Sequence, residues 1–202
     1  GAKAIASGSA SVAGAYGVED GEDVSMEDAL ANAARIVASV DLPVTIDFEG
    51  GYAVEPDEAA RNVALLAATG AIGCNFEDQV VGGAGMHDID LQSRRIAAIR
   101  GAVGPDFFIN ARTDFFLQAK PEAHDAALAD AAIERAKAYA DAGASGFFIP
   151  GLTDLALVER ITKASPIPVN AMTWTGAPSN QEWANAGIAR ISYGPGPFRQ
   201  MQ

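Results

Sequence analysis

The stretch PVTIDFEGGY (43–52) places two carboxylates on one face of a predicted strand. Side chains alternate between the two faces of a strand, so Asp47 and Glu49 point the same way. Glu77 closes a second apolar run, GCNFED. Three carboxylates are oxygen ligands, and this favours Mg²⁺ or Mn²⁺ over zinc. The alternative interpretation is that these acids cap helices or are solvated strand ends.

Arg112 shares a predicted strand face with Asn110 in the run FFINART. A guanidinium there could form a fork on a carboxylate or a phosphonate. An ion pair with Glu77 or Asp47 inside the fold is the alternative, and both interpretations can hold together.

Three further stretches are open to two interpretations each. His87 follows the glycine-rich run 82–85, which is either a lid over a site or an ordinary surface loop. Cys74 is expected to be a buried, inert thiol rather than a nucleophile. The run GPGPF (194–198) could offer backbone N–H groups to a phosphate, or it could simply be a turn.

Composition limits the partners. The 202 residues carry a formal net charge of −12, with a pI near 4.4 and 49% hydrophobic residues. No clustered basic surface is expected, which argues against nucleic-acid and anionic-membrane partners. A single cysteine excludes an internal disulfide, and no apolar run approaches the roughly 20 residues of a membrane helix. We therefore expect a cytoplasmic protein.

Apolar runs punctuated by glycine and proline predict alternating strands and helices. The expected strands cover residues 4–11 (running into a loop), 43–50, 72–78, 107–113, 146–150, 168–173 and 189–193. The expected helices cover residues 25–40, 55–70, 90–103, 121–143, 154–165 and the region around 181–186.

This alternation predicts an α/β fold with a parallel sheet, either an open doubly wound sheet or a closed barrel. No G-x-G-x-x-G and no G-K-[ST] phosphate loop is present. Polar residues follow several strands, as in a (βα)8 TIM-type barrel, whose sites collect at the C-terminal strand ends. We expect one barrel domain over residues 1–202, incomplete at both ends, with the first strand and its helix and the final helix missing.

Six blocks together resemble the isocitrate lyase and phosphoenolpyruvate mutase superfamily over nearly the whole chain. They are AIASGSASVAGAYGVEDGE, PVTIDFEGGYA, GCNFEDQ, INARTD, GASGFFIPGL and ISYGPGPFRQM. The resemblance implies a Mg²⁺-dependent barrel of the phosphoenolpyruvate/pyruvate-binding kind that acts on 2-oxo acids or their enol forms. It also implies a homo-oligomer, usually a tetramer in which the last helix swaps between subunits.

The resemblance implies roles for particular residues as well. The metal would be held, largely through waters, by Asp20, Asp47, Glu49 and Glu77. Backbone N–H groups of Ser9 and Ala10 would hold the pyruvyl group, and Arg112 would bind a carboxylate.

The chain departs from the lyase pattern in the glycine-rich loop. Lyases of the superfamily carry Lys-Arg-Cys-Gly-His, whose cysteine donates a proton, whereas this chain has Gly83, Ala84, Gly85, Met86 and His87.

Three hypotheses follow. The first is a lyase-type enzyme that cleaves or hydrolyses the carbon–carbon bond beside the carbonyl, with Arg112, Glu77 and His87 as catalytic residues and Asp47 also contacting substrate. The second is a phosphonopyruvate-type mutase or hydrolase. The third is a degenerate member that binds a metal and a 2-oxo acid without turnover.

Overall fold

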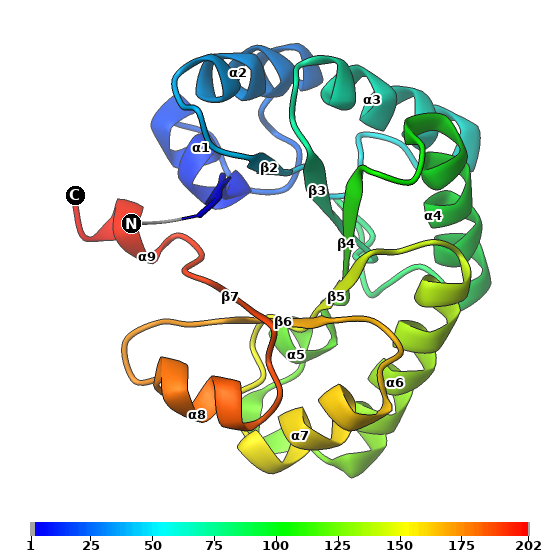
Figure 1. Cartoon of the computed structure of the whole chain (residues 1–202), viewed down its shortest axis with the longest axis vertical. Helices are drawn as coiled ribbons and strands as arrows, with labels where there is room; N and C mark the ends of the chain where they lie inside the picture. Colours follow the sequence, from blue (N-terminus) through cyan, green and yellow to red (C-terminus); the bar gives the residue numbers. More distant parts are fainter. Residues whose placement is uncertain (1–2, 202) are drawn as a thin grey trace.

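The structure, a computed structural model that describes residues 3–201, contains one curved sheet of seven parallel strands. The strands pair in chain order, and Figure 1 shows that they curl around a central space with the helices on the outside. They are β1 (Ile5–Ala6), β2 (Val44–Asp47), β3 (Gly73–Glu77), β4 (Phe108–Arg112), β5 (Gly146–Phe148), β6 (Val169–Met172) and β7 (Arg190–Ser192). The predicted parallel α/β architecture is confirmed.

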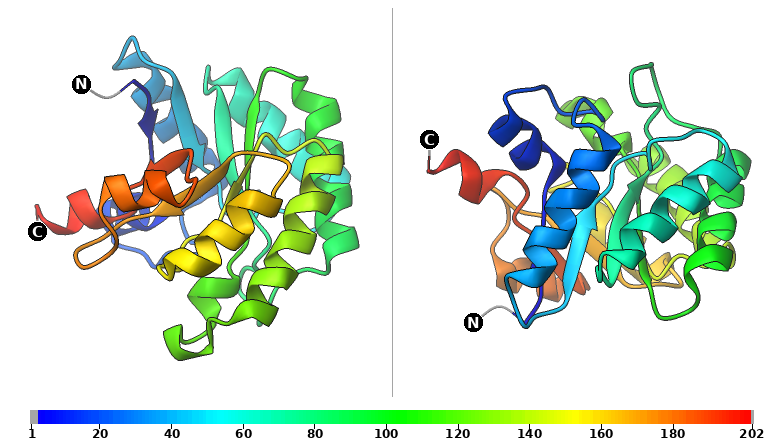
Figure 2. Two further views of the ribbon diagram at one scale, coloured as in Figure 1. Left: turned by 60° about the horizontal axis from the view of Figure 1, so that its bottom comes forward. Right: turned by 90° about the horizontal axis from the view of Figure 1, so that it is seen from above.

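Helices follow the strands and cover the convex face of the sheet (Figure 2). They are α1 (Ser9–Tyr16), α2 (Met26–Ala38), α3 (Pro56–Ala68), α4 (Ile89–Val103), α5 (Phe115–Gln118), the 3₁₀ helix η1 (Pro121–Ala123), α6 (Ala126–Asp141), α7 (Leu155–Ala164), α8 (Asn180–Asn185) and α9 (Gly196–Arg199). Several begin at a side-chain cap: the carboxylates of Asp88, Asp125 and Asp154 accept N–H bonds in the first turns of α4, α6 and α7.

The N-terminal prediction is wrong in part. The strand expected over 4–11 is only two residues long, and the chain turns into helix α1 at Ser9. A run of Ser, Ala and Gly has no apolar periodicity, so the helix had no signal in the sequence. As a result, Ser9 and Ala10 lie in the first turn of a helix, where backbone N–H groups lack intrahelical partners.

The region 115–141 is also more divided than predicted. The long helix expected over 121–143 begins only at Ala126, after the short elements α5 and η1. Asp125 caps its start by accepting the Leu128 N–H at 2.9 Å. The turn expected at 194–198 includes the start of α9, a helix of four residues.

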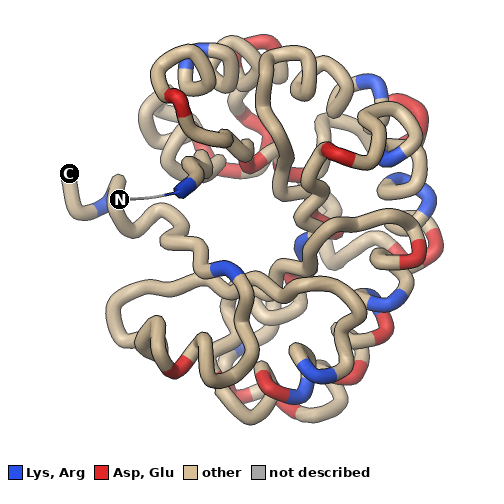
Figure 3. The backbone as a smooth tube through the Cα atoms, viewed as in Figure 1, with Lys and Arg blue, Asp and Glu red and all other residues tan. Residues whose placement is uncertain are grey.

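The main core lies between the sheet and the helices. Val63, Leu66, Ile96 and Ile99 from α3 and α4 are fully buried against the strands. The concave face is different in character, because the polar residues Thr45, Asn75, Asn110 and Asn170 are buried on the strands. Figure 3 accordingly shows charged residues on the outer helices and a smaller number along the strands that line the interior.

The two edges of the sheet are β1 and β7, and within residues 3–201 they do not pair with each other. One side-chain bond crosses the interior near this opening, from Arg190 Nη2 on β7 to Thr45 Oγ1 on β2 at 3.1 Å. Within the same part of the chain, no helix is long and apolar enough to cross a membrane.

Candidate functional site

Asp47, the last residue of β2, points its carboxylate toward the start of α1. Its Oδ2 accepts the backbone N–H of Ser9 at 3.3 Å and the Ser9 hydroxyl at 3.2 Å. Its own N–H donates to Ser7 Oγ at 3.1 Å. The positive end of a helix favours a carboxylate at this place. Asp47 therefore sits at the helix N-terminus that holds Ser9 and Ala10, the two residues expected to bind a pyruvyl group.

Glu49 lies with Asp47 at the C-terminal ends of the strands, here called the rim. Its backbone conformation differs from the one predicted. Strand β2 ends at Asp47, and Glu49 has a positive φ of 49°, so strand alternation does not set its direction. Its Oε2 accepts the Glu22 N–H at 2.8 Å. Burial and the nearby charge of Asp20 raise the pKa of Glu49 to about 7. Asp20 is therefore close enough to act on Glu49, although its own side chain is exposed.

Glu77, the last residue of β3, joins Glu49 and Arg112 at this rim. Its backbone N–H donates to the Glu49 carbonyl at 2.9 Å. Its carboxylate lies 2.9 Å from Arg112 Nη1, and the side chain is almost fully buried. Burial raises the pKa of Glu77, while the charge of Arg112 acts against that shift. The expected ion pair between Arg112 and Glu77 is thus present.

Arg112 also donates hydrogen bonds to Asp114, a residue that was not among the predicted site residues. Its Nε and Nη2 donate to the two carboxylate oxygens of Asp114 at 2.6 and 3.0 Å. Burial opposes the charge of Arg112, but Glu77 and Asp114 together hold its pKa above the usual value. A guanidinium has five N–H donors, and the two hydrogen bonds to Asp114 occupy only one edge of it.

The acids suit a divalent ion that keeps most of its waters. Over residues 3–201, no three His, Cys, Asp or Glu side chains are grouped closely enough to hold an ion by direct contact alone. Asp47 Oδ1, however, is buried without a hydrogen-bond partner. Asp47 lines a small pocket of about 20 Å³ together with Ser9, Glu49 and Tyr52 and with apolar residues such as Val12. Mg²⁺ is typically bound by one or two carboxylates plus water, so the residues fit this ion.

His87 lies at the end of the glycine-rich loop, which is closed by an antiparallel bridge between Gln79 and Met86. Its N–H donates to the Asp78 carbonyl at 2.8 Å, and its carbonyl accepts from Arg135 Nη2 at 2.9 Å. Burial, and then the charge of Arg95, lower the pKa of the imidazole. No hydrogen bond or ion pair of the described residues joins the imidazole to Asp47, Glu49, Glu77 or Arg112.

Other predictions about single residues can now be assessed. Cys74 is fully buried on β3, and burial raises its thiol pKa far above the usual value, as expected for an inert cysteine. Glu22 was missed, because its contacts with Glu49 and Tyr52 join segments that are 27 and 30 residues apart. The contact of Asp114 could have been predicted from the sequence, because Asp114 follows Arg112 by two residues in ARTD.

Comparisons with known proteins show the family and the fold of the chain. The family model described as phosphoenolpyruvate phosphomutase matches residues 1–202. The 2-methylisocitrate lyase of Escherichia coli (strain K12) is 32% identical over 211 residues, and the match covers 96% of this chain and 67% of that enzyme. A proposed phosphonomutase from Burkholderia cenocepacia J2315 is 46% identical, with a TM-score of 0.96, and the match covers 100% of this chain and 81% of that one.

A third comparison bears on the fold alone. The solved complex of phosphonopyruvate hydrolase with oxalate and Mg²⁺ has a TM-score of 0.86 at 22% identity, and the match covers 100% of this chain and 71% of that chain. The family model matches the whole chain, and the curated lyase exceeds 30% identity over 96% of it. The chain belongs to the phosphoenolpyruvate mutase and isocitrate lyase superfamily, whose barrel its seven strands follow.

Proposed function

We propose that the chain is part of a Mg²⁺-dependent lyase-type enzyme that binds a small 2-oxo carboxylate and cleaves or hydrolyses the carbon–carbon bond beside the carbonyl. One observation carries the proposal: Asp47, Glu49, Glu77 and Arg112 come from three strand ends and meet at one rim of the sheet. Acids and an arginine gathered at strand C-termini are typical of catalytic sites in this architecture.

Each residue has a part in the proposed chemistry. Asp47 and Glu49 would hold the ion, and Asp20 and Glu77 would orient its waters. A bound Mg²⁺ would polarise the carbonyl and stabilise the enolate. Manganese would suit the same oxygen ligands.

The substrate would be held by groups that the chain already aims at the rim. Arg112 would bind the carboxylate through N–H donors that Asp114 does not occupy, and the first turn of α1 at Ser9 and Ala10 would hold the oxo acid with N–H groups. Ser9 N–H donates to Asp47 in the free chain, so binding requires it to exchange that partner. His87 is our assignment for proton transfer, and the loop 79–87 would have to move to bring its imidazole to the rim.

Asp47 offers the direct test of this site. Asp47→Ala removes both Oδ1, the buried carboxylate oxygen without a hydrogen-bond partner, and the contact with Ser9. We expect it to abolish Mg²⁺-dependent binding of oxalate or pyruvate in calorimetry, while Asp154→Ala, at a helix cap on α7, leaves binding unchanged. Unchanged binding in Asp47→Ala would contradict the site.

Phosphonate chemistry is the second candidate. Glycines replace the lysine and cysteine of the lyase lid at Gly83 and Gly85, and the 46% identical relative is described as a phosphonomutase. A degenerate protein that binds an oxo acid without turnover is the third.

One screen separates the three candidates. Oxaloacetate, alkylmalates, methylisocitrate and phosphonopyruvate would each be incubated with Mg²⁺ and with chelator. Metal-dependent carbon–carbon cleavage supports the first candidate, phosphate release or conversion of phosphonopyruvate to an isomer supports the second, and binding without product supports the third.

A further inference from the structure

Helix α4 contacts the backbone of both acid-bearing strand ends through two buried side chains. Gln92 Nε2 donates to the carbonyl of Glu77 at 3.0 Å. Arg95 Nη2 donates to the carbonyls of Gly50 and Ala53, the latter at 2.8 Å, on the turn that follows Glu49. Arg95 and Gln92 are also joined, because Arg95 Nη1 donates to Gln92 Oε1 at 2.5 Å.

This turn needs such support because its backbone is unusual. Glu49 and Tyr52 have φ values of 49° and 55°, a region that side chains other than glycine rarely adopt. Gly51, between them, has a φ of 76° and lies so close to Phe76 that a Cβ would meet the ring at 2.9 Å. Conformations of this kind persist only where surrounding contacts hold them.

Arg95 is well placed to give that support, and among residues 3–201 it forms no ion pair with a carboxylate. It is 1% exposed, and its guanidinium stacks on the Phe76 ring, 4.6 Å from the centroid. Its hydrogen-bond partners are two backbone carbonyls and the Gln92 amide, all of them neutral. Its planar fork therefore serves the turn, and its charge also acts on the nearby carboxylate of Glu22, which accepts the Tyr52 N–H of the same turn.

We propose that Arg95, supported by Gln92, is a positioning residue that fixes Glu49 and Glu77 relative to each other so that both can serve one divalent ion. It acts through the backbone and touches neither carboxylate. The link it maintains is visible as the hydrogen bond from the Glu77 N–H to the Glu49 carbonyl. This inference rests on the divalent-ion site of the proposed function.

The same helix supplies a matched control. Arg100 also donates to backbone carbonyls, those of Gly104, Phe107 and Gly143, and to Ser145 Oγ. Phe107 and Ser145 lie just before β4 and β5, at the opposite ends of the strands from the acids. Loss of Arg100 removes a comparable set of hydrogen bonds without touching the proposed site.

The first arm of the test measures metal affinity. Mg²⁺ and Mn²⁺ would be titrated by calorimetry into the full chain and into Arg95→Met, Arg95→Lys and Arg100→Met, with melting temperatures recorded for each. We expect Arg95→Met to weaken metal affinity by about tenfold or more, as for other groups that orient ligands. Arg95→Lys should be intermediate, and Arg100→Met should keep its affinity although its melting temperature falls. Equal affinity in Arg95→Met and the parent chain, or equal losses in Arg95→Met and Arg100→Met, would overturn the inference.

The second arm does not need metal. Amide hydrogen exchange by NMR reports the Glu77 N–H directly, and we expect it to exchange faster in Arg95→Met than in Arg100→Met, both without metal. Arg95→Lys replaces Arg95→Met in this comparison if the latter does not fold. If the parent chain binds no divalent ion, the proposed function fails while faster Glu77 exchange still supports the positioning role. Unchanged Glu77 exchange in the Arg95 variants refutes that role.

Discussion

Arg112 and Glu77 face each other across neighbouring strands, with Nη1 of the arginine 2.9 Å from Oε2 of the acid. Asp114 holds the other edge of the same guanidinium through two oxygens. The arginine is therefore fixed in plane and direction before any substrate arrives. This arrangement suits a group whose part is to bind one planar anion in one orientation.

Arg112→Lys tests that part. Lysine keeps the charge that Glu77 and Asp114 need but loses the planar fork. With Mg²⁺ saturating, we expect the affinity for oxalate or pyruvate to fall about 10- to 100-fold, the size of one or two charge-assisted hydrogen bonds. Calorimetry measures this directly.

The control is Arg190→Lys, at an arginine of β7. Its described hydrogen bond goes to the neutral Thr45 hydroxyl rather than to an acid. Oxalate affinity in this variant should stay within about twofold of the parent. Equal losses in the two variants would mean that the effect of Arg112→Lys is not local to the carboxylate.

Most of the strands and several residues of the candidate site could be predicted from the sequence. Apolar runs bounded by glycine and proline predicted β2 through β7, and Asp47, Glu77 and Arg112 were correctly placed at strand ends. These predictions rest on local patterns, and local patterns are what a single sequence records. Helix α1 was missed because small residues have no periodicity.

The parts of the site that the sequence did not reveal depend on local backbone geometry and long-range contacts. Glu49 was predicted, but it turns into the site through a positive φ, which strand alternation does not predict. Its partner Glu22 is 27 residues away, and Arg95 contacts Gly50 from 45 residues away. Neither contact follows from composition or spacing.

The shifted pKa of Glu49 predicts how stability depends on pH when no metal is bound. The folded chain holds the Glu49 proton up to about pH 7, whereas the unfolded chain releases it near its ordinary value of 4.5. Between these values the folded state binds more protons, so stability falls as the pH rises from about 4.5 to about 7. Urea unfolding with chelator across this range should show the decline, on the order of 2 kcal/mol after screening by solvent.

Glu49→Gln should reduce this decline, because the amide does not titrate. Glu182→Gln serves as control: hydrogen bonds from Ser179 lower the pKa of Glu182, so its contribution is lost only as the pH falls below about 4.5. Added Mg²⁺ should stabilise the parent chain more at pH 8 than at pH 5, because protons compete with the ion. A flat profile in the metal-free parent would contradict the assignment.

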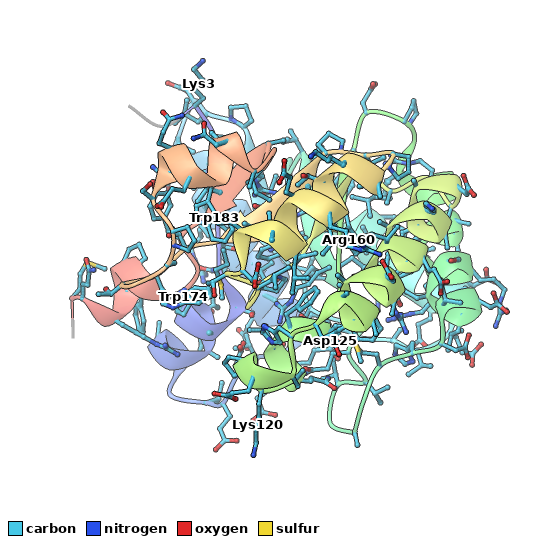
Figure 4. The ribbon with its side chains drawn as sticks, turned by 90° about the horizontal axis from the view of Figure 1, so that it is seen from below. Lys3, Lys120, Asp125, Arg160, Trp174 and Trp183 are labelled. Carbon is cyan, nitrogen blue, oxygen red and sulfur yellow. The ribbon has the colours of Figure 1, made fainter. Side chains whose placement is uncertain are left out.

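The buried pair of Asp78 and Arg135 predicts a stability effect that the surface pair of Asp130 and Arg160 lacks. Asp78 Oδ2 accepts from Arg135 at 3.0 Å and from the Tyr139 hydroxyl at 2.9 Å, and its side chain is fully buried. Arg135→Met leaves that carboxylate without its cation, which should cost about 3–5 kcal/mol in urea unfolding. Arg160 of α7, labelled in Figure 4, pairs with Asp130 of α6 on the surface, where both side chains are about half exposed. Arg160→Met should leave the unfolding midpoint almost unchanged.

Adding Asp78→Asn to Arg135→Met should restore part of the lost stability, because a neutral amide is less costly to bury than an unpaired charge. If the double variant were less stable than Arg135→Met alone, the loss would come from packing around Arg135 rather than from the charge of Asp78.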